Sequence, residues 1–450
     1  MTSSPDVPRS ATNRIAWRLL PFLWLLYLIA YLDRANVAFA NLEMSHALHF
    51  SDSVFGFGAG IFFVGYVLLE IPGAVIVERW SARRWLARIM ISWGILAGLV
   101  GLVNTPHEFY GARFLLGVAE AGFFPGVIVY LKHWIREADR AKAIAIFITA
   151  TTVANIIGSP IAGPILQVHW HGLSGWRWLF ILEGVPAVVF GVATLFYLPD
   201  WPHQASWLPK AECDWITAEL DREKKTTASS RSHTIREALR HREVLQLALI
   251  YFLGSNGVYG FTFWFPTILK RASGFSTNKV TLLGALPFVA ALIAILVNGW
   301  SSDRKKERRW HTAVPLFSAG IFLIFTIASE SHIWIQFICF VLFAGLVFSY
   351  QPIFWALPTT FLGESAAAAS VGFINCIGGL GGFAGPYIIG YLSERTGSFT
   401  YGLCWLLFDL FAAGILVLLL RGKVHFDRSS GIPSKLPVNR PPDLSRIVPL

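Results

Sequence analysis

The chain has 450 residues, of which 54% are hydrophobic and only 14% are charged. A soluble domain carries about 25% charged residues, so this composition argues against a soluble globular protein. The formal net charge of +10 does not indicate nucleic-acid binding, because the basic residues lie in short loops between long apolar runs. The four cysteines have no spacing typical of a disulfide framework or a metal site, and we expect no metal and no cofactor.

Long apolar runs predict membrane-spanning helices along most of the chain. A hydrocarbon core of about 30 Å requires roughly 20 apolar residues as a helix. The first set of predicted spans is 17–38, 53–76, 84–104, 108–131, 142–166 and 178–198. The second set is 244–269, 279–300, 311–329, 333–357, 366–391 and 401–420. The sequence therefore predicts an all-α membrane protein with twelve transmembrane helices.

Basic residues gather in every second loop, which predicts the orientation of the chain. They are Arg9, Arg14, Arg18, Arg79, Arg83, Arg84, Arg88, Lys132, Arg136, Arg140, Lys142, Arg304, Lys305, Lys306, Arg308, Arg309, Arg421, Lys423 and Arg428. The opposite loops hold almost no lysine or arginine, apart from Lys270, Arg271 and Lys279. The positive-inside rule then places both termini and the central loop in the cytoplasm, as in a multi-pass protein of the inner (plasma) membrane.

Two motifs that occur once in each half of the chain indicate an internal duplication. Glu78-Arg79 is followed by Arg83-Arg84, and Asp303-Arg304 is followed by Arg308-Arg309 at a similar place in the second set of spans. Gly163-Pro164 in the fifth span recurs as Gly385-Pro386 in the eleventh, at nearly the same separation. Short loops are commonly basic, which would explain one basic cluster but not the repetition of both the basic motif and the Gly-Pro pair. We expect two parallel-repeat bundles of six helices, 1–198 and 244–420, joined by a cytoplasmic loop, 199–243, and followed by a cytoplasmic tail, 421–450.

Several motifs resemble those of a known family. The segment G-W-S-S-D-R-K-K-E-R-R at 299–309 is similar to the loop signature of the major facilitator superfamily, with Lys306 in place of the usual glycine. Other segments resemble its anion:cation symporter branch: Y-L-D-R-A-N at 31–36, E-I-P-G at 70–73, E-R-W-S-A-R-R-W at 78–85, A-E-A-G-F-F-P-G at 119–126 and G-W-R-W-L-F-I-L-E-G-V-P at 175–186. The second half looks most like bacterial importers of tartrate, other hydroxy acids or aromatic acids. The resemblance implies the major facilitator fold.

Four charged residues lie inside predicted spans of the first half. A charge at the centre of a membrane helix is costly, so such residues pair with one another or line a watery cavity. The helical rise puts Arg113 at about the depth of Asp33 and Arg34, and Glu120 about 10 Å deeper. We expect Asp33 to pair with Arg113 in at least one state, which leaves Arg34 available for a carboxylate. The alternative is a static ion-pair network that holds the first bundle together.

The family resemblance assigns roles to these charges. It implies that Arg34 contacts the substrate anion and that Asp33 and Glu120 carry the coupling proton, with Arg113 as their neighbour. It also implies substrate contacts for Tyr66, Trp355 and Asn375. Tyr27, Tyr31 and Arg34 fall at i, i+4 and i+7, so both hydroxyls are expected to flank the site. For each aromatic residue, simple packing within a bundle is an equal alternative.

The remaining intramembrane polar residues are expected to have structural roles or to help hold the substrate. For Glu70 we expect structural bonding at the loop motif, with a functional role as the alternative, and we expect Glu183 and Asp409 to be structural. Asn256 and Tyr259, with residues of the tenth and eleventh spans, give the second half a neutral polar lining. Conformational locks between the halves are expected at Glu78, Arg79, Asp303 and Arg304.

Together these features predict a secondary transporter, not an enzyme. The expected activity is proton-coupled import of a small organic anion by alternating access: a tartrate-like hydroxy acid, a sugar acid or an aromatic carboxylate. Sodium is the alternative coupling ion. An uncoupled facilitator or exchanger, and a membrane ligand sensor, are the alternative functions. The expected partners are the carboxylate, protons and the lipid bilayer, with the chain acting as a monomer.

Overall fold

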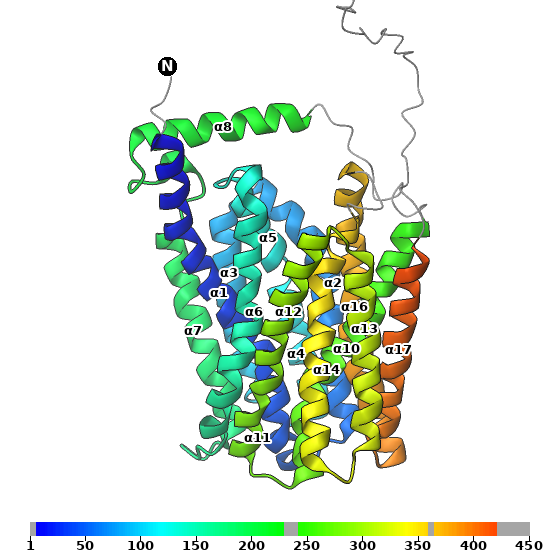
Figure 1. Ribbon diagram of the computed structural model, residues 1–450. Helices are drawn as coiled ribbons and strands as arrows, with labels where there is room; N and C mark the ends of the chain where they lie inside the picture. Colours follow the sequence, from blue (N-terminus) through cyan, green and yellow to red (C-terminus); the bar gives the residue numbers. More distant parts are fainter. Residues whose placement is uncertain (1–5, 229–241, 359–363, 421–450) are drawn as a thin grey trace, which may run out of the picture.

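The computed structural model describes residues 6–228, 242–358 and 364–420, and within them the secondary structure consists of helices joined by turns and loops, with an isolated bridge between Trp170 and Leu173. Most helices run side by side along one axis, and α8 (Lys210–Ala228) lies across one end of them (Figure 1). We call this the α8 end, and the other the α11 end, after α11 (Thr277–Gly284). The predicted tail, 421–450, and the side chains of Glu78 and Arg79 lie outside the described part of the chain.

Each predicted span coincides with a helix or a pair of helices. Those before the central loop are α1 (Asp6–Ala47), α2 (Asp52–Arg79), α3 (Ala82–Val100), α4 (Pro106–Glu120), α5 (Phe123–Lys132), α6 (Glu137–Leu166) and α7 (Gly175–Tyr197). The loop itself contains η1 (Pro202–Gln204) and α8. The later helices are α10 (Arg242–Ser273), α11, α12 (Leu286–Lys305), α13 (Arg309–Ala328), α14 (Ile333–Phe354), α16 (Glu364–Thr396) and α17 (Thr400–Leu419).

Two of the spans are broken helices. Between α4 and α5, Gly122 adopts a φ of +84°, a left-handed conformation that costs a glycine little and that ends α4 without ending the span. Between α11 and α12 the chain turns at Ala285, just before Pro287. Eleven described spans are long and apolar enough to cross a membrane. The twelfth, α3, has 19 residues but carries Arg83, Arg84 and Arg88 in its first two turns.

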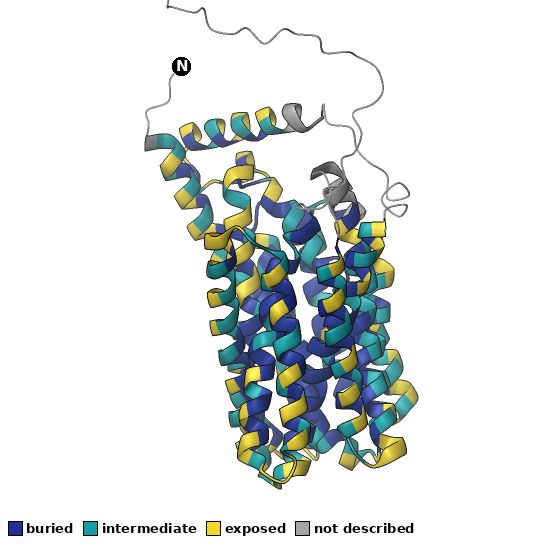
Figure 2. Ribbon diagram, turned by 45° about the vertical axis from the view of Figure 1, so that its right-hand side comes forward, coloured by how far each residue is buried: buried dark blue, intermediate teal, exposed yellow. Residues whose placement is uncertain are grey.

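The outer surface of the helices is apolar, as a bilayer requires. Large side chains such as Phe196, Leu296 and Phe408 are more than 60% exposed, and exposed residues follow the outer faces of the rods while buried ones line the interior (Figure 2). Lipid tails satisfy such a surface, whereas a soluble monomer rarely exposes so much of it. The all-α, multi-pass membrane fold predicted from the sequence is confirmed.

Helices far apart in the sequence form the interior. We call residues 6–198 the N-terminal half and 242–420 the C-terminal half. Within the N-terminal half α1 packs on α6 and α3 on α7, and within the C-terminal half α10 packs on α16 and α17. Between the halves, α2 packs on α16, α6 on α11 and α1 on α10. The division into two bundles at the predicted boundaries stays a prediction.

The central polar segment is held against the N-terminal half. Glu212 of α8 accepts hydrogen bonds from Ser10 Oγ at 2.7 Å and from Arg14 Nε at 3.0 Å, both at the start of α1. Farther along α8, Glu223 pairs with Arg140 Nη2 at 3.2 Å. The described part of the segment therefore forms a polar cover over this end of the N-terminal half.

Candidate functional site

Arg34 lies in the interior of the protein, within a group of aromatic rings. Its Nη2 donates to Glu120 Oε1 in a buried ion pair, and its Nη1 lies 3.4 Å from the hydroxyl of Tyr31. The guanidinium carbon stands 4.8 Å from the ring centre of Tyr31, 5.0 Å from that of Phe62 and 5.4 Å from that of Tyr66. Only 9% of Arg34 is exposed. The arrangement provides one strong anion site in apolar surroundings.

The observed pairing of the four charges differs from the expected one. Asp33, 1% exposed, accepts from Trp93 Nε1 at 3.1 Å, and its Oδ1 has no hydrogen-bond partner among the described residues. Arg113 is fully buried, and none of its side-chain nitrogens bonds to a described residue. The expected Asp33–Arg113 pair is therefore absent in this conformation. Arg34, which we expected to be available for a carboxylate, pairs with Glu120 in this conformation.

The direction of helical side chains explains this difference. Side chains tilt toward the N-terminus of their own helix, so a depth estimate from backbone rise misplaces long ones. Because α1 begins at the α8 end, Arg34 leans toward that end, where Glu120 lies at the close of α4. Arg113 belongs to α4, which runs opposite to α1, so its side chain and that of Asp33 tilt in opposite directions along the bundle axis.

Gly117 supports this geometry in a way the sequence did not reveal. In the structure a Cβ at Gly117 would stand 2.0 Å from the backbone oxygen of Phe62, so the glycine lets α4 lie directly against α2. This close approach brings Phe62 over both arginines, since its ring centre is 4.9 Å from Arg113 Cζ and 5.0 Å from Arg34 Cζ.

The two tyrosines of α1 have different surroundings. Tyr31 touches Arg34 and lies beside Tyr259 of α10. Tyr27 is 8% exposed, and its ring stacks on Phe147 at 4.3 Å and on Phe123 at 5.9 Å. Of the two, Tyr31 is the one whose ring and hydroxyl lie against the Arg34 guanidinium.

The C-terminal half contributes an amide and aromatic rings. Asn375 of α16 donates its Nδ2 to Glu70 Oε1 of α2, and Cys376 Sγ lies 3.9 Å from Glu70 Oε2. Trp355 meets the ring of Tyr251 edge-on at 4.8 Å. The expectation that Glu70 bonds near the loop motif was wrong, because its partners lie on the opposite half. Tyr251 was not predicted, although Tyr251, Ser255 and Tyr259 recur at intervals of four on one face of α10.

Other buried polar residues of this half are structural. Asn256 Nδ2 donates to Asp409 Oδ2 at 2.9 Å, which joins α10 to α17 deep in the half. Both residues are fully buried. This bond confirms the structural role expected of Asp409, and it removes Asn256 from the lining of the site.

The halves are joined at the α11 end by contacts that the sequence did not predict. Arg271 pairs with Asp52 through two hydrogen bonds of 2.6 and 2.7 Å, and Ser393 Oγ donates to Asp52 Oδ2 at 2.7 Å. Nearby, Asn41 Nδ2 donates to Thr267 Oγ1 at 3.0 Å. Arg271 is one of the three basic residues that depart from the positive-inside pattern. Its position thus has a structural explanation, since it neutralises an acid on the other half.

The expected lock at the other end has a different form. Asp303 pairs with Arg308 at 2.7 Å within the turn between α12 and α13. Arg304 stacks on Trp300 of its own helix, 5.4 Å from the ring centre. In this conformation, both residues make these contacts inside the C-terminal half, so the expected inter-half lock is not formed by them.

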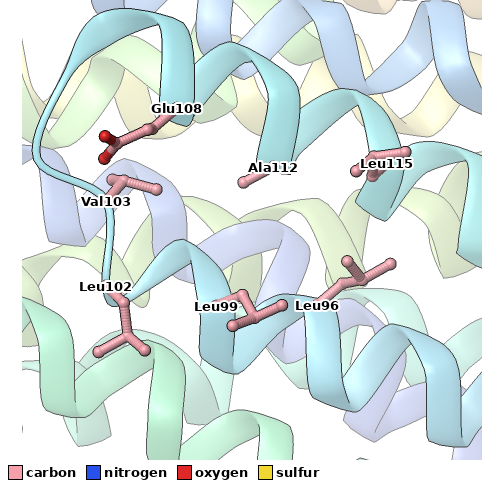
Figure 3. A pocket seen from close by; sticks show the side chains of 7 residues that line it. All are labelled: Leu96, Leu99, Leu102, Val103, Glu108, Ala112 and Leu115. Carbon is pink, nitrogen blue, oxygen red and sulfur yellow. The ribbon is translucent and has the colours of Figure 1, made fainter.

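A separate groove lies on the flank between α3 and α4. It is lined by Leu96, Leu99, Leu102, Val103, Glu108, Ala112 and Leu115 (Figure 3). The one acid in its lining, Glu108, has a structural partner, since its Oε2 accepts a hydrogen bond from the backbone nitrogen of Asn104 at 2.7 Å. Leu99, Leu102 and Leu115 are about half exposed on the apolar outer face. The groove contains no group able to hold an anion, and it is separate from the Arg34 site.

Comparisons with known proteins agree with this architecture. A sequence profile of the Major Facilitator Superfamily matches residues 23–386. The chain belongs to this superfamily. A "Putative tartrate transporter" of Agrobacterium vitis is 42% identical over 416 residues, which cover 92% of each chain. The "Quinolone resistance transporter" of Acinetobacter baumannii is 34% identical over 434 residues, covering 96% of this chain and 100% of that protein.

A solved structure shows the same fold. The crystal structure of a D-xylose-proton symporter aligns with a TM-score of 0.72 at 14% identity, covering 90% of this chain and 98% of that one. The family resemblance drawn from the motifs is confirmed, and the protein is a membrane transporter and not an enzyme. Members of the superfamily bind small-molecule substrates, which directs attention to the interior site around Arg34.

Proposed function

We propose that this transporter imports a small organic anion together with protons across the inner (plasma) membrane by alternating access. One observation carries the proposal. Among the described residues at the interior aromatic site, Arg34 is the one cation with an acidic partner, and that partner is Glu120. Arg34 can bind a substrate carboxylate through two parallel hydrogen bonds only if it gives up this partner.

Exchange at Arg34 would couple the anion to a proton. A substrate carboxylate that takes the guanidinium leaves Glu120 buried without a cation. A buried charge in that position costs several kcal/mol, so Glu120 binds a proton instead. The site then holds one anion and one proton where it held neither. When the proton leaves, Glu120 returns to Arg34 and displaces the substrate.

Asp33 would provide a second protonation site. It has one hydrogen-bond donor, Trp93, and no cation within bonding distance among the described residues. Arg113 lies in the same buried cluster with its nitrogens unbonded. We propose that the two pair in another state of the cycle and that Asp33 is protonated when they are apart.

The substrate class follows from the groups around Arg34. The guanidinium selects a carboxylate, and Tyr31 and Tyr66 offer hydroxyls and rings. The other half would add Asn375, which bonds to Glu70, and Trp355, which packs on Tyr251. This set fits a tartrate-like hydroxy acid, a sugar acid or an aromatic carboxylate. The resemblance to a protein named for tartrate supports the first of these.

The orientation follows from charge in the loops. The positive-inside rule puts the α8 end in the cytoplasm. The α11 end, where the Asp52–Arg271 pair joins the halves, would then face outward. We propose that the two halves, 1–198 and 244–420, rock as rigid bundles within a monomer.

Uptake by proteoliposomes tests the proposal. The purified protein is reconstituted, and entry of labelled tartrate, gluconate and benzoate is followed with and without an imposed inward proton gradient. We expect accumulation of at least one acid that rises with the gradient. Absence of uptake for all acids would contradict transport of this class, and uptake indifferent to the gradient would indicate an uncoupled facilitator. A sodium gradient serves as the matched control.

A further inference from the structure

The contact between Glu70 and Asn375 joins the two halves inside the substrate site. Glu70 follows Tyr66 by one helical turn on the same face of α2, and Tyr66 stands 5.4 Å from Arg34 Cζ. Glu70 is 7% exposed, while Asn375 is only partly buried. The pair therefore lies about one turn beyond Tyr66 from the anion site, toward the α8 end.

The chemistry of this contact determines which way the Asn375 amide faces. A carboxylate only accepts hydrogen bonds, whereas an amide donates through nitrogen and accepts through oxygen. Asn375 must therefore turn its Nδ2 toward Glu70, as it does. The thiol of Cys376 approaches the second oxygen, Oε2, at 3.9 Å, so both carboxyl oxygens have donors. A proton on Oε2 would leave the Asn375 contact unchanged.

With Nδ2 bonded to Glu70, the carbonyl oxygen of the Asn375 amide remains available as a hydrogen-bond acceptor. Asn375 Oδ1 accepts no hydrogen bond from any described residue. The oxygen and nitrogen of an amide point in different directions from one carbon, so Oδ1 faces away from Glu70. An acceptor at the edge of the site is satisfied by a substrate that brings a hydroxyl donor, and it is left unpaired by one that does not.

We propose that Glu70 is a positioning residue that holds Asn375 with its carbonyl oxygen toward the substrate, and that this arrangement selects organic acids bearing a hydroxyl group. This inference rests on the proposed function of the Arg34 site, and it adds a source of specificity to it. Glu70 does not touch the substrate in this account. It acts through the orientation of one amide.

Matched pairs of acids measure the selection. Binding of L-malate and succinate, which differ by one hydroxyl, is compared on the full chain in nanodiscs, and mandelate and phenylacetate form a second pair. One neutral hydrogen bond corresponds to a preference of about tenfold for the hydroxylated acid in the wild-type protein. For Glu70→Gln the preference falls to about two- to threefold, because a glutamine accepts or donates and no longer imposes one orientation.

A reversed pair provides the decisive control. In Asn375→Asp two acids face each other, and binding of both members of a pair weakens. In the double variant Glu70→Gln with Asn375→Asp, the glutamine donates to the new carboxylate, whose second oxygen again accepts the hydroxyl. We expect the preference of about tenfold to return.

The outcomes separate this inference from the proposed function. An unchanged preference in Glu70→Gln, with or without loss of thermal stability, would show a merely structural bond. Wild-type binding of both members of each pair with equal affinity would also overturn the positioning role, while leaving anion transport intact. If no acid bound at all, the substrate class itself would be contradicted, and this inference with it.

Discussion

The interiors of the two halves differ in how they satisfy buried polar groups. The N-terminal half places two arginines and two acids in one cluster, and only one ion pair forms among them, Arg34–Glu120. In the described part of the C-terminal half, the deep acid Asp409 accepts a hydrogen bond from the amide of Asn256 through Oδ2, and its Oδ1 has no partner. A cluster of two arginines and two acids can exchange ion-pair partners, whereas the bond between Asp409 and Asn256 involves a single ionisable group. The comparison indicates that ion handling belongs to the first half and rigid support to the second.

The strongest test of this contrast is removal of Arg34. Arg34→Ala leaves a substrate carboxylate without a cation in an apolar site, and truncation of a buried charged partner costs about 2–5 kcal/mol. We expect affinity to fall by at least about 100-fold and transport to be lost, as measured by equilibrium binding and liposome uptake.

Two variants control for damage to the fold. The double variant Arg34→Ala with Glu120→Gln removes the unpaired acid and should recover thermal stability without recovering binding. Arg177→Ala removes a partly buried contact in the loop after α3, where Arg177 bonds to the backbone oxygen of Gly101 at 2.9 Å, and should keep wild-type affinity. Preserved affinity in Arg34→Ala would remove this residue from the carboxylate site.

Glu120 separates coupling from movement. Glu120→Gln cannot ionise, so the proton gradient no longer drives accumulation, which otherwise gains about tenfold per pH unit for each coupled proton. Counterflow exchange of labelled for unlabelled acid continues, because it needs no net proton movement. Glu212→Gln is the matched control, because Glu212 is also a buried acid but bonds to Ser10 and Arg14 at the α8 end, away from Arg34. Full gradient-driven accumulation in Glu120→Gln would refute the coupling role.

The C-terminal half is expected to lose stability rather than function. Asp409→Leu leaves the Asn256 amide without its acceptor in a fully buried position, which costs about 1–3 kcal/mol. We expect a lower melting temperature in detergent with unchanged substrate affinity in the folded fraction. A change in the proton dependence of uptake would instead give this half a part in ion handling.

The smallest effect is expected at the α11 end. The Asp52–Arg271 pair is half exposed on the arginine side, so it contributes about 1 kcal/mol or less. Arg271→Ala should shift the population toward opening at this end by up to about fivefold. A single cysteine at Asn41, in a background without the native cysteines, reports this as faster labelling by an impermeant maleimide. Equal labelling rates would mean that the pair does not hold this end closed.

The sequence predicted the helices and identified the charged residues that lie together in the interior. It did not predict which of these residues bond to each other. Hydropathy alone located each span, and helical rise brought Asp33, Arg34 and Arg113 to one depth. The Arg34–Glu120 pair was missed because long side chains tilt toward the N-terminus of their helix, in opposite directions on α1 and α4. The partners of Glu70 and Asp52 lie on the other half of the chain, and a local sequence pattern cannot predict contacts between residues so far apart. Tyr251, by contrast, was visible in the four-residue spacing on α10.

The most direct test of the account is the count of protons taken up when substrate binds. The purified protein is mixed with its acid in weakly buffered solution near neutral pH, and the pH change is followed with an indicator. Displacement of Glu120 from Arg34 requires protonation of Glu120, so we predict uptake of about one proton per bound anion in the wild type and none in Glu120→Gln. Binding without proton uptake by the wild-type protein would contradict the exchange at Arg34.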